Sequence, residues 1–234
     1  MIDIHTHVLP GMDDGSGSLN ESLQLLEESA QQGVKIMGAT SHFYATDERP
    51  ADFLRRRRVA ATELGEHWRE GMPHLLLGAE VHFFESISRI DELDYFRLGT
   101  SKLLLLEMPF KPWTDRMIRE VLDIQDRRGL TVLLAHIERY LGFQDKAVWP
   151  MLRANGVCMQ CNASFFLNWK TRRKAMGMLK RGEIHMLGSD CHNMTTRPPR
   201  LWEAKAAIQK ALGMSFWREF ELGTIDLLQS GRHS

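Results

Sequence analysis

Residues 102–136 read KLLLLEMPFKPWTDRMIREVLDIQDRRGLTVLLAH, and this stretch contains the repeating unit of the chain. The apolar runs at 102–108 and 131–136 are continuous, as is typical of parallel strands covered on both faces. Between them, 115–128 has the spacing of an amphipathic helix, and Gly129 follows where that helix should end. The order strand, helix, strand predicts a right-handed parallel crossover.

The same alternation of short apolar runs and amphipathic stretches recurs along the chain. Strands are predicted at 1–7, 35–42, 75–82, 102–108, 131–136, 157–163 and 184–190. Helices are predicted at 19–32, 51–70, 115–128, 146–154, 170–180, 201–212 and 215–228. Ser18 with Glu21 predicts a capping box at the start of the first helix. Seven such units indicate an α/β protein with either a barrel or a doubly wound sheet, and we expect 1–234 to form a single domain because no linker interrupts them.

The composition is typical of a globular protein of the cytoplasm. Thirty Lys and Arg residues balance thirty Asp and Glu residues, so the chain has no net positive field for general nucleic-acid binding. No apolar run approaches the ~20 residues of a membrane span, and the first residues do not resemble a signal peptide. Three cysteines, a low and odd number, favour a reducing compartment over a disulfide framework. We therefore expect a cytoplasmic protein that neither inserts into membranes nor binds nucleic acid.

Metal-competent side chains stand at the carboxyl ends of six of the seven predicted strands, the edge at which barrels and open parallel sheets build their sites. They are His5 and His7, His42, Glu80, Glu107, His136, and Asp190 with His192 just beyond it. The spacing His5-Thr6-His7 puts both imidazoles on one face of a strand. A lone histidine at a strand end is more often structural, so the prediction depends on the whole set. So many ligands exceed the need of one ion and predict two or three, with Glu80 as a bridging carboxylate, an arrangement typical of hydrolytic phosphate chemistry.

Six segments then carry a resemblance to a known family: DIHTHVLPGMDDGS, ATSHF, GAEVHF, LLAHIERY, QCNASFF and SDCHNMTTRPPR. The sequence resembles the polymerase-and-histidinol-phosphatase (PHP) superfamily, and within it most closely the bacterial capsule-operon tyrosine-protein phosphatases. The resemblance runs from residue 3 to about residue 200. It implies a distorted seven-stranded, TIM-like (β/α)7 barrel of the PHP type with a trinuclear, usually manganese-dependent site.

The resemblance also implies which residues form the site. The implied metal ligands are His5, His7, Asp14, His42, Glu80, Glu107, His136, Asp190 and His192. Asp13 lies beside Asp14, so the choice between these two carboxylates stays open. Arg139 and Arg197 match the two arginines that hold the phosphate in this family. The implied cofactors are two or three divalent ions, manganese first and iron, zinc or magnesium as alternatives. The implied substrate is protein phosphotyrosine, typically in the tyrosine-rich tail of a bacterial polysaccharide-export kinase.

Physical chemistry suggests how such a site acts. A phosphate monoester dianion repels nucleophiles, and clustered divalent ions neutralise that charge and lower the pKa of bound water. Our hypothesis is in-line attack by a metal-bridging hydroxide, with Arg139 and Arg197 clamping phosphoryl oxygens as guanidinium forks. A small-molecule phosphatase acting on histidinol phosphate is the main alternative. A phosphoesterase for nucleotides is disfavoured by the zero net charge, and a non-catalytic domain has no need for so many costly polar groups.

Two cysteine patterns require separate interpretation. Cys191 and Arg197 have the C-x5-R spacing of cysteine-dependent tyrosine phosphatases, but no glycine lies between them and Pro198 follows at once, so we interpret the spacing as a coincidence. Cys158 and Cys161 are expected on opposite faces of a strand, packed in the core. His82 shares the face of Glu80 by strand parity, so it is able to reach the site, although we expect it to lie outside the site.

Overall fold

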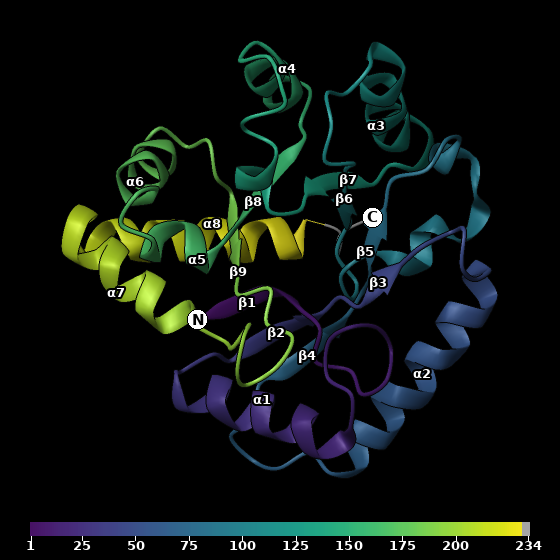
Figure 1. Ribbon diagram of the computed structural model, residues 1–234, viewed down its shortest axis with the longest axis vertical. Coiled ribbons are helices and arrows are strands. Elements are labelled where there is room, and N and C mark those ends of the chain that lie inside the picture. Colours follow the sequence, from purple (N-terminus) through teal and green to yellow (C-terminus); the bar gives the residue numbers. More distant parts are fainter. Residues whose placement is uncertain (231–234) are drawn as a thin grey trace.

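The computed structural model describes residues 1–230, in which strands and helices alternate along the chain (Figure 1). The strands are β1 (Ile2–Thr6), β2 (Ile36–Ala39), β3 (His42–Phe43), β4 (His74–Leu77), β5 (Glu80–His82), β6 (Leu103–Glu107), β7 (Thr131–Leu134), β8 (Cys158–Asn162) and β9 (Met186–Gly188). The α-helices are α1 (Leu19–Gln31), α2 (Pro50–Glu66), α3 (Asp115–Arg128), α4 (Val148–Ala154), α5 (Ala163–Leu167), α6 (Arg172–Lys180), α7 (Leu201–Leu212) and α8 (Met214–Gln229). Three 3-10 helices are η1 (Ile87–Arg89), η2 (Asp91–Phe96) and η3 (Ile137–Arg139).

All strand pairs are parallel, and they form two sheets. One sheet has the order β1-β2-β4, and the other has the order β3-β5-β6-β7-β8-β9. Backbone hydrogen bonds from Asp190 N to His5 O (2.8 Å) and from His7 N to Cys191 O (2.9 Å) join the end of β1 to the segment after β9. The result is a curled parallel arrangement of strands with the helices around it (Figure 1). The α/β class is confirmed.

The seven predicted strands appear as nine shorter ones. The predicted strand 35–42 is divided between β2 and β3, and 75–82 is divided between β4 and β5. The division has a cause in the backbone: Gly78 N donates to Ala39 O (3.0 Å), but Ala79 N turns away and donates to Phe96 O (3.0 Å). The two divided segments stay paired with each other, but their outer neighbours change: β2 lies beside β1, whereas β5 lies beside β6. The hydrogen bonds therefore do not describe one seven-stranded sheet.

The predicted helices are found, with shifted ends. The predicted bounds 115–128 and 201–212 are those of α3 and α7, whereas α2 ends four residues before the predicted 70. At α1 the Ser18 side chain accepts the Glu21 backbone N–H (3.2 Å), as predicted, but the Glu21 carboxylate accepts Gly17 N (2.9 Å) rather than Ser18 N. The short helix α5 was not predicted, because it follows β8 without an intervening loop.

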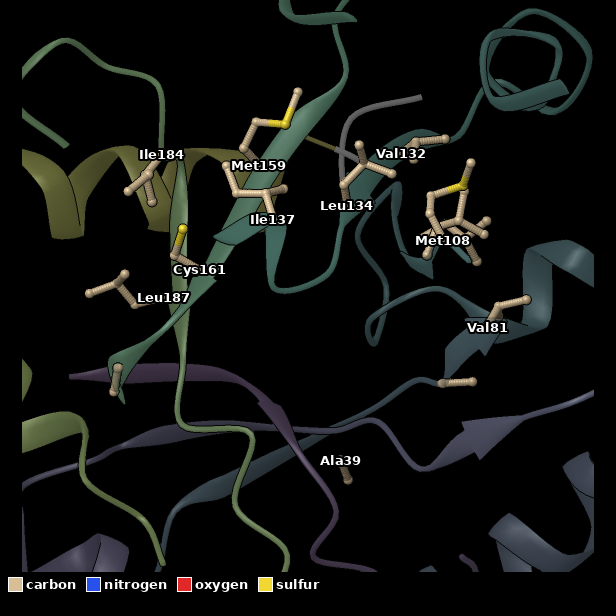
Figure 2. Packing of buried hydrophobic residues seen from close by; sticks show 14 of the residues in the cluster. Ala39, Val81, Met108, Val132, Leu134, Ile137, Met159, Cys161, Ile184 and Leu187 are labelled. Carbon is tan, nitrogen blue, oxygen red and sulfur yellow. The ribbon is translucent and has the colours of Figure 1, made fainter. Parts of the chain in front are cut away.

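The hydrophobic core lies on both faces of the strands. Leu104 and Leu106 of β6 belong to the larger cluster, which faces the helices, and Leu103 and Leu105 belong to a smaller one. Figure 2 shows part of the larger cluster, including Leu134 and Met159. Since side chains alternate along a strand, Glu107 shares the face of the smaller cluster. Within residues 1–230, no helix has the length and apolar content needed to cross a bilayer.

Candidate metal centre

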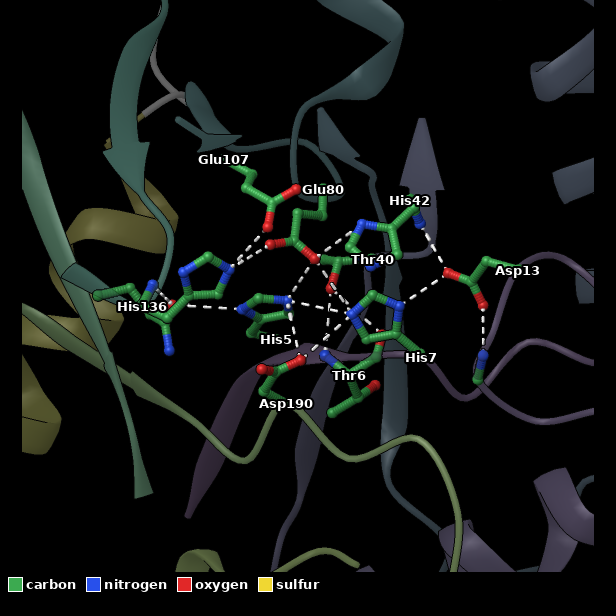
Figure 3. A network of polar contacts seen from close by, with 12 residues as sticks. His5, Thr6, His7, Asp13, Thr40, His42, Glu80, Glu107, His136 and Asp190 are labelled. Carbon is green, nitrogen blue, oxygen red and sulfur yellow. Dashed lines mark hydrogen bonds and ion pairs between the residues drawn. The ribbon is translucent and has the colours of Figure 1, made fainter. Parts of the chain in front are cut away.

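Four side chains converge where β1 and β9 end and β5 begins (Figure 3). His5 Nε2 lies 3.2 Å from His7 Nε2 and 2.9 Å from Glu80 Oε2. Asp190 Oδ1 lies 3.6 Å from His5 Nε2 and 3.4 Å from His7 Nε2. Two ligands that each stand about 2.1 Å from one ion are about 3.0–3.4 Å apart at octahedral or tetrahedral angles. The spacing therefore fits four ligands around a common cation.

Hydrogen bonds on the outer side of His5 and His7 strengthen this fit. His5 Nδ1 donates to Gln160 Oε1 (3.2 Å), and His7 Nδ1 donates to Asp13 Oδ2 (2.7 Å). When each ring keeps its proton on Nδ1, the two Nε2 lone pairs face one another. Two lone pairs 3.2 Å apart repel unless a cation lies between them. The tautomers set by the surrounding protein are thus those that a metal ion requires.

Two further groups extend the cluster on either side. Asp14, His42 and His192 meet His7 in one of them, and His42, Glu80 and Glu107 form the other. His7 and Glu80 are shared between groups, so the three groups form one continuous cluster. His136 lies in none of them, but its Nε2 is 2.8 Å from Glu80 Oε1 and 3.4 Å from Glu107 Oε1. All nine predicted ligands therefore lie at one edge of the strands.

The charges of the cluster demand a counter-charge. Burial alone would raise the pKa of Glu80, but the charge of His5 and hydrogen bonds from His136, His5 and His7 hold the pKa well below its usual range. Burial alone would lower the pKa of His136, yet hydrogen bonds to Glu107 and Glu80 raise it to about 9. The buried carboxylates thus stabilise positive charge beside them, and bound divalent cations would supply that charge.

His42 and His192 have the opposite character. Burial lowers the pKa of both imidazoles, to about 4 for His192, where the charges of His7 and Arg197 add to the effect. His42 Nδ1 and His192 Nε2 have no hydrogen-bond partner within residues 1–230, although Glu80 Oε2 lies 3.2 Å from His42 Nδ1 at an unsuitable angle. A neutral imidazole with an unpaired buried nitrogen is suited to bind a metal ion.

The structure separates the roles of the two adjacent aspartates. Asp13 is nearly buried and accepts His7 Nδ1, His42 N (2.7 Å) and Gly15 N (3.0 Å), so its oxygens are occupied by protein donors. Asp14 is 66% exposed, and its Oδ1 lies 3.3 Å from His192 Nε2 and 3.6 Å from His42 Nε2. The geometry favours Asp14 as a metal ligand and gives Asp13 the task of orienting His7.

A network that the sequence interpretation missed supports the other side of the cluster. Gln160 Oε1 accepts both His5 Nδ1 and His136 N (2.6 Å). Gln160 Nε2 donates to Asn162 Oδ1 (2.9 Å), and Asn162 Nδ2 donates to Asp190 Oδ2 (2.7 Å). The sequence did contain a signal for this network, because Gln160 and Asn162 are two polar residues on the same face of the buried strand β8. His82, which we expected outside the site, donates from Nδ1 to Glu107 Oε2 (3.0 Å), so that expectation is wrong.

The backbone brings the ligands together at some conformational cost. His136 (φ 32°) and Asp190 (φ 55°) both adopt left-handed conformations that non-glycine residues rarely occupy. Gly188 leaves no room for a side chain, because a Cβ there would lie 2.5 Å from His5 Cβ. Strain and close packing at one edge are expected where a site, rather than stability, determines the structure.

Comparison with known proteins gives the relationship a name. A family model described as capsular polysaccharide synthesis, CpsB/CapC, matches residues 1–223. The chain belongs to the CpsB/CapC family. It is 32% identical over 226 residues to tyrosine-protein phosphatase CpsB of Streptococcus agalactiae, with 91% of each chain covered. It is 26% identical over 227 residues to tyrosine-protein phosphatase YwqE of Bacillus subtilis, covering 91% of this chain and 85% of YwqE.

Solved structures of this family share the fold. A crystal structure described as YwqE from Bacillus subtilis and CpsB from Streptococcus pneumoniae, metal-dependent tyrosine phosphatases, matches with a TM-score of 0.84 at 24% identity. The match covers 98% of this chain and 95% of that one. The resemblance noted in the sequence is confirmed at the level of the CpsB/CapC family.

Both predicted arginines, Arg139 and Arg197, reach the cluster of proposed metal ligands, and both contact Asp190. Arg139 Nη2 lies 2.5 Å from Asp190 Oδ2, and Arg197 Nη2 lies 2.6 Å from Asp190 Oδ1. Their side chains are 38% and 35% exposed, so both stand at the rim of the cluster. Two guanidinium groups at the mouth of a carboxylate-rich site are suited to hold an anion there.

The cysteine loop of this CpsB/CapC chain cannot cradle a phosphate. Backbone N–H groups of Thr195, Thr196 and Arg197 all donate to Asn193 Oδ1, at 3.0, 2.8 and 3.1 Å. Cys191 is buried, and burial raises the pKa of its thiol far from the range of a reactive thiolate. The C-x5-R spacing is therefore a coincidence, as predicted. Cys158 and Cys161 belong to different core clusters, as expected for opposite faces of β8.

Proposed function

We propose that this chain is a metal-dependent phosphatase that hydrolyses phosphotyrosine in proteins. The observation that carries the proposal is the continuous cluster around Glu80, with Arg139 and Arg197 at its rim beside Asp190. Cations held by the cluster and guanidinium groups at its edge are the two elements needed to bind a phosphate dianion. The names of the relatives CpsB and YwqE support the same activity.

The proposed ligands are the nine residues predicted from the sequence, and Asp13, Gln160 and Asn162 hold them in place. The number of ligands suits two or three ions, and the mixture of imidazole and carboxylate suits manganese, with iron, zinc or magnesium as alternatives. When bound, divalent ions neutralise phosphate charge and lower the pKa of water. Arg139 and Arg197 each contact Asp190 through Nη2, and a guanidinium has further N–H groups that can orient the phosphoryl oxygens.

Aromatic side chains beside the cluster favour an aryl phosphate. The Tyr44 ring lies 5.2 Å from the His42 ring, and the Phe110 ring lies 6.0 Å from the His136 ring. Phe110 is 47% exposed, so part of its ring is open to contact with a substrate. A phenol ring packs well against such walls, whereas histidinol phosphate, the alternative substrate, presents a smaller and more polar group.

We also propose how the chain is organised, where it acts and which protein it acts on. We propose that residues 1–234 act as one domain, of which 231–234 lie outside the described residues, and that the two sheets together make a distorted barrel of seven strand positions. Two observations support the barrel: the divided strands keep the same parallel pairing on both sides of each break, and backbone hydrogen bonds join the end of β1 to the segment after β9. We also propose a cytoplasmic location, which suits three free thiols, and a bacterial tyrosine kinase as the phosphorylated partner.

The test is phosphate release from a phosphotyrosine peptide beside histidinol phosphate, with added manganese and after chelation. We expect chelator-sensitive turnover with a preference for the peptide. A preference for histidinol phosphate would keep the metal centre and refute the substrate. Turnover that survives complete metal removal would refute the site.

A further inference from the structure

A large open groove begins beside the metal centre at Arg139 and runs along α5 and the α5–α6 loop (168–171) to Arg200 at the start of α7. We call it the α5–α6 groove. It has a volume of about 760 Å³, and its lining includes Glu138, Arg139, Asn168, Trp169, Lys170 and Arg200. Arg139 belongs to both places, because its guanidinium contacts Asp190 of the cluster. A peptide whose phosphotyrosine lies at the cluster can therefore extend directly into this groove.

The α5–α6 loop at the groove and the start of α6 are basic. The carboxylate in the groove lining, Glu138, accepts the backbone N–H of Asn162 (3.2 Å). The segment 164–174 reads SFFLNWKTRRK and contains four cations and no carboxylate. Lys170, Arg173 and Lys174 are exposed, and none of them forms an ion pair with another side chain among residues 1–230. Arg139 and Arg200 differ, because Asp190 and Glu203 neutralise them. The unpaired charge at this end of the site is thus concentrated on Lys170 and its neighbours.

The same sign of charge continues along α6. Lys174 lines a neighbouring cavity of about 480 Å³ together with Lys146 and Arg153. The carboxylate in its lining is Glu183, which already pairs with Arg181 at 2.9 Å. A chain that leaves the groove past α6 therefore meets further uncompensated positive charge.

The cavity on the opposite side of the cluster is acidic. It has a volume of about 370 Å³, and it is lined by Asp14, Asp47 and Glu48, with Arg56 as its basic residue. Arg56 is held by Glu48 at 2.6 Å. The two cavities that touch the cluster thus differ in sign, and an anionic group next to the phosphotyrosine is directed into the α5–α6 groove.

Trp169 supplies a contact surface at the same place. Its side chain is 80% exposed, and Lys170 Nζ lies 5.5 Å from its ring centroid. An exposed indole beside an ammonium group offers an apolar face and a cation to one ligand. The core does not require this residue.

Building on the proposed function, we infer that the α5–α6 groove binds an anionic side chain that flanks the phosphotyrosine in the substrate. Lys170 and Trp169 in the groove lining make this contact, together with Lys174 on the first turn of α6, which follows the groove-lining loop. Carboxylates and a second phosphate share the chemistry that this surface recognises. The groove thereby determines which phosphotyrosine sequences bind well, whereas hydrolysis of the phosphate ester takes place at the metal centre.

The test compares short phosphotyrosine peptides whose flanking residues are serine, glutamate or a non-hydrolysable phosphotyrosine analogue. The proteins are the wild type, the double variant Lys170→Gln/Lys174→Gln, Trp169→Ala, and Lys210→Gln as a control for loss of an exposed charge on α7. Kinetic constants are measured with manganese, and the affinity of non-hydrolysable versions is measured by fluorescence anisotropy at two salt concentrations.

We expect the wild type and Lys210→Gln to prefer an anionic flank by about two- to tenfold, mainly through a lower KM. In Lys170→Gln/Lys174→Gln the ratio of kcat/KM between anionic and neutral peptides falls toward one, and the affinity for anionic peptides becomes no more salt-dependent than the affinity for neutral peptides. Equal preference for peptides with a glutamate flank and with a phosphotyrosine-analogue flank indicates a general anion site. A stronger preference for the phosphotyrosine-analogue flank indicates that the site binds a second phosphotyrosine.

The outcomes separate this inference from the proposed function. Hydrolysis of all peptides at similar rates by the wild type, or a preference that survives Lys170→Gln/Lys174→Gln, would overturn the inference and leave the phosphatase in place. Failure to hydrolyse any peptide or p-nitrophenyl phosphate with manganese would overturn the proposed function and the inference with it.

Discussion

Asp13→Asn is the substitution that most specifically tests how the protein orients its ligands. Asp13 accepts three N–H groups: His7 Nδ1 and His42 N both reach Oδ2, and Gly15 N reaches Oδ1. Asparagine has the same shape but keeps one acceptor oxygen. Its best arrangement retains both bonds at the Oδ2 position and sets its NH2 group against Gly15 N–H. The variant therefore loses one hydrogen bond and the negative charge behind His7.

The size of the effect follows from these contacts. A hydrogen bond to a charged group contributes about 1.5–3 kcal/mol, which is roughly 10- to 100-fold in a binding constant. Losing the partner of a metal-binding histidine has effects of about that size on metal affinity. We expect Asp13→Asn to weaken Mn²⁺ binding to this extent, while the protein still unfolds in a cooperative transition.

Isothermal titration with Mn²⁺ measures this effect directly. Asp47→Asn is the matched control, because Asp47 lines the same cavity and carries the same charge, but within residues 1–230 its carboxylate accepts from the Thr46 hydroxyl and not from a histidine. Unchanged Mn²⁺ affinity in Asp13→Asn, or an equal loss in Asp47→Asn, would refute the orienting role. Equal losses would show that the affinity depends on net charge near the cluster rather than on the hydrogen bond to His7.

Three further substitutions test other parts of the account. Cys191→Ser should keep most of the phosphatase activity, measured as phosphate release, since the thiol is buried; loss of activity would revive the cysteine mechanism. Gly188→Ala should lower both metal content and thermal stability, because the new Cβ would lie 2.5 Å from His5 Cβ; normal metal content would contradict the packing argument. His185 accepts Met159 N–H (3.0 Å), and burial and the charge of Arg153 lower its pKa, so the unfolded chain binds a proton there below pH 6.5 that the folded chain does not. Stability should therefore fall as the pH drops below that value, and denaturant titrations should show a smaller fall in His185→Asn; equal falls would exclude His185 as the cause.

The positions of the metal ligands could be predicted because they depend on local rules. Continuous apolar runs identify parallel strands, and the carboxyl ends of parallel strands meet at one edge. His5, His7 and Asp190 therefore came together in the prediction without knowledge of any distance. Strand parity also placed Cys158 and Cys161 on opposite faces.

Other features depend on contacts that no local pattern encodes. The division of 75–82 into β4 and β5 results from the turn of Ala79 N toward Phe96, a partner far along the chain. Asp13 and Asp14 are chemically identical neighbours in a loop, and only the direction of each side chain separates the one that holds His7 from the one that faces His192. His82 was misplaced because parity gives the face of a strand but not the reach of a side chain.

The most direct test of the central claim is the metal content of the purified protein, measured by elemental analysis together with phosphotyrosine hydrolysis, for the wild type and Glu80→Gln. Glu80 is shared by two of the three ligand groups, so its loss should disrupt both of them. We predict two or three divalent ions per wild-type chain, and a parallel loss of ions and turnover in Glu80→Gln. A metal-free protein that hydrolyses phosphotyrosine at the wild-type rate would contradict the account.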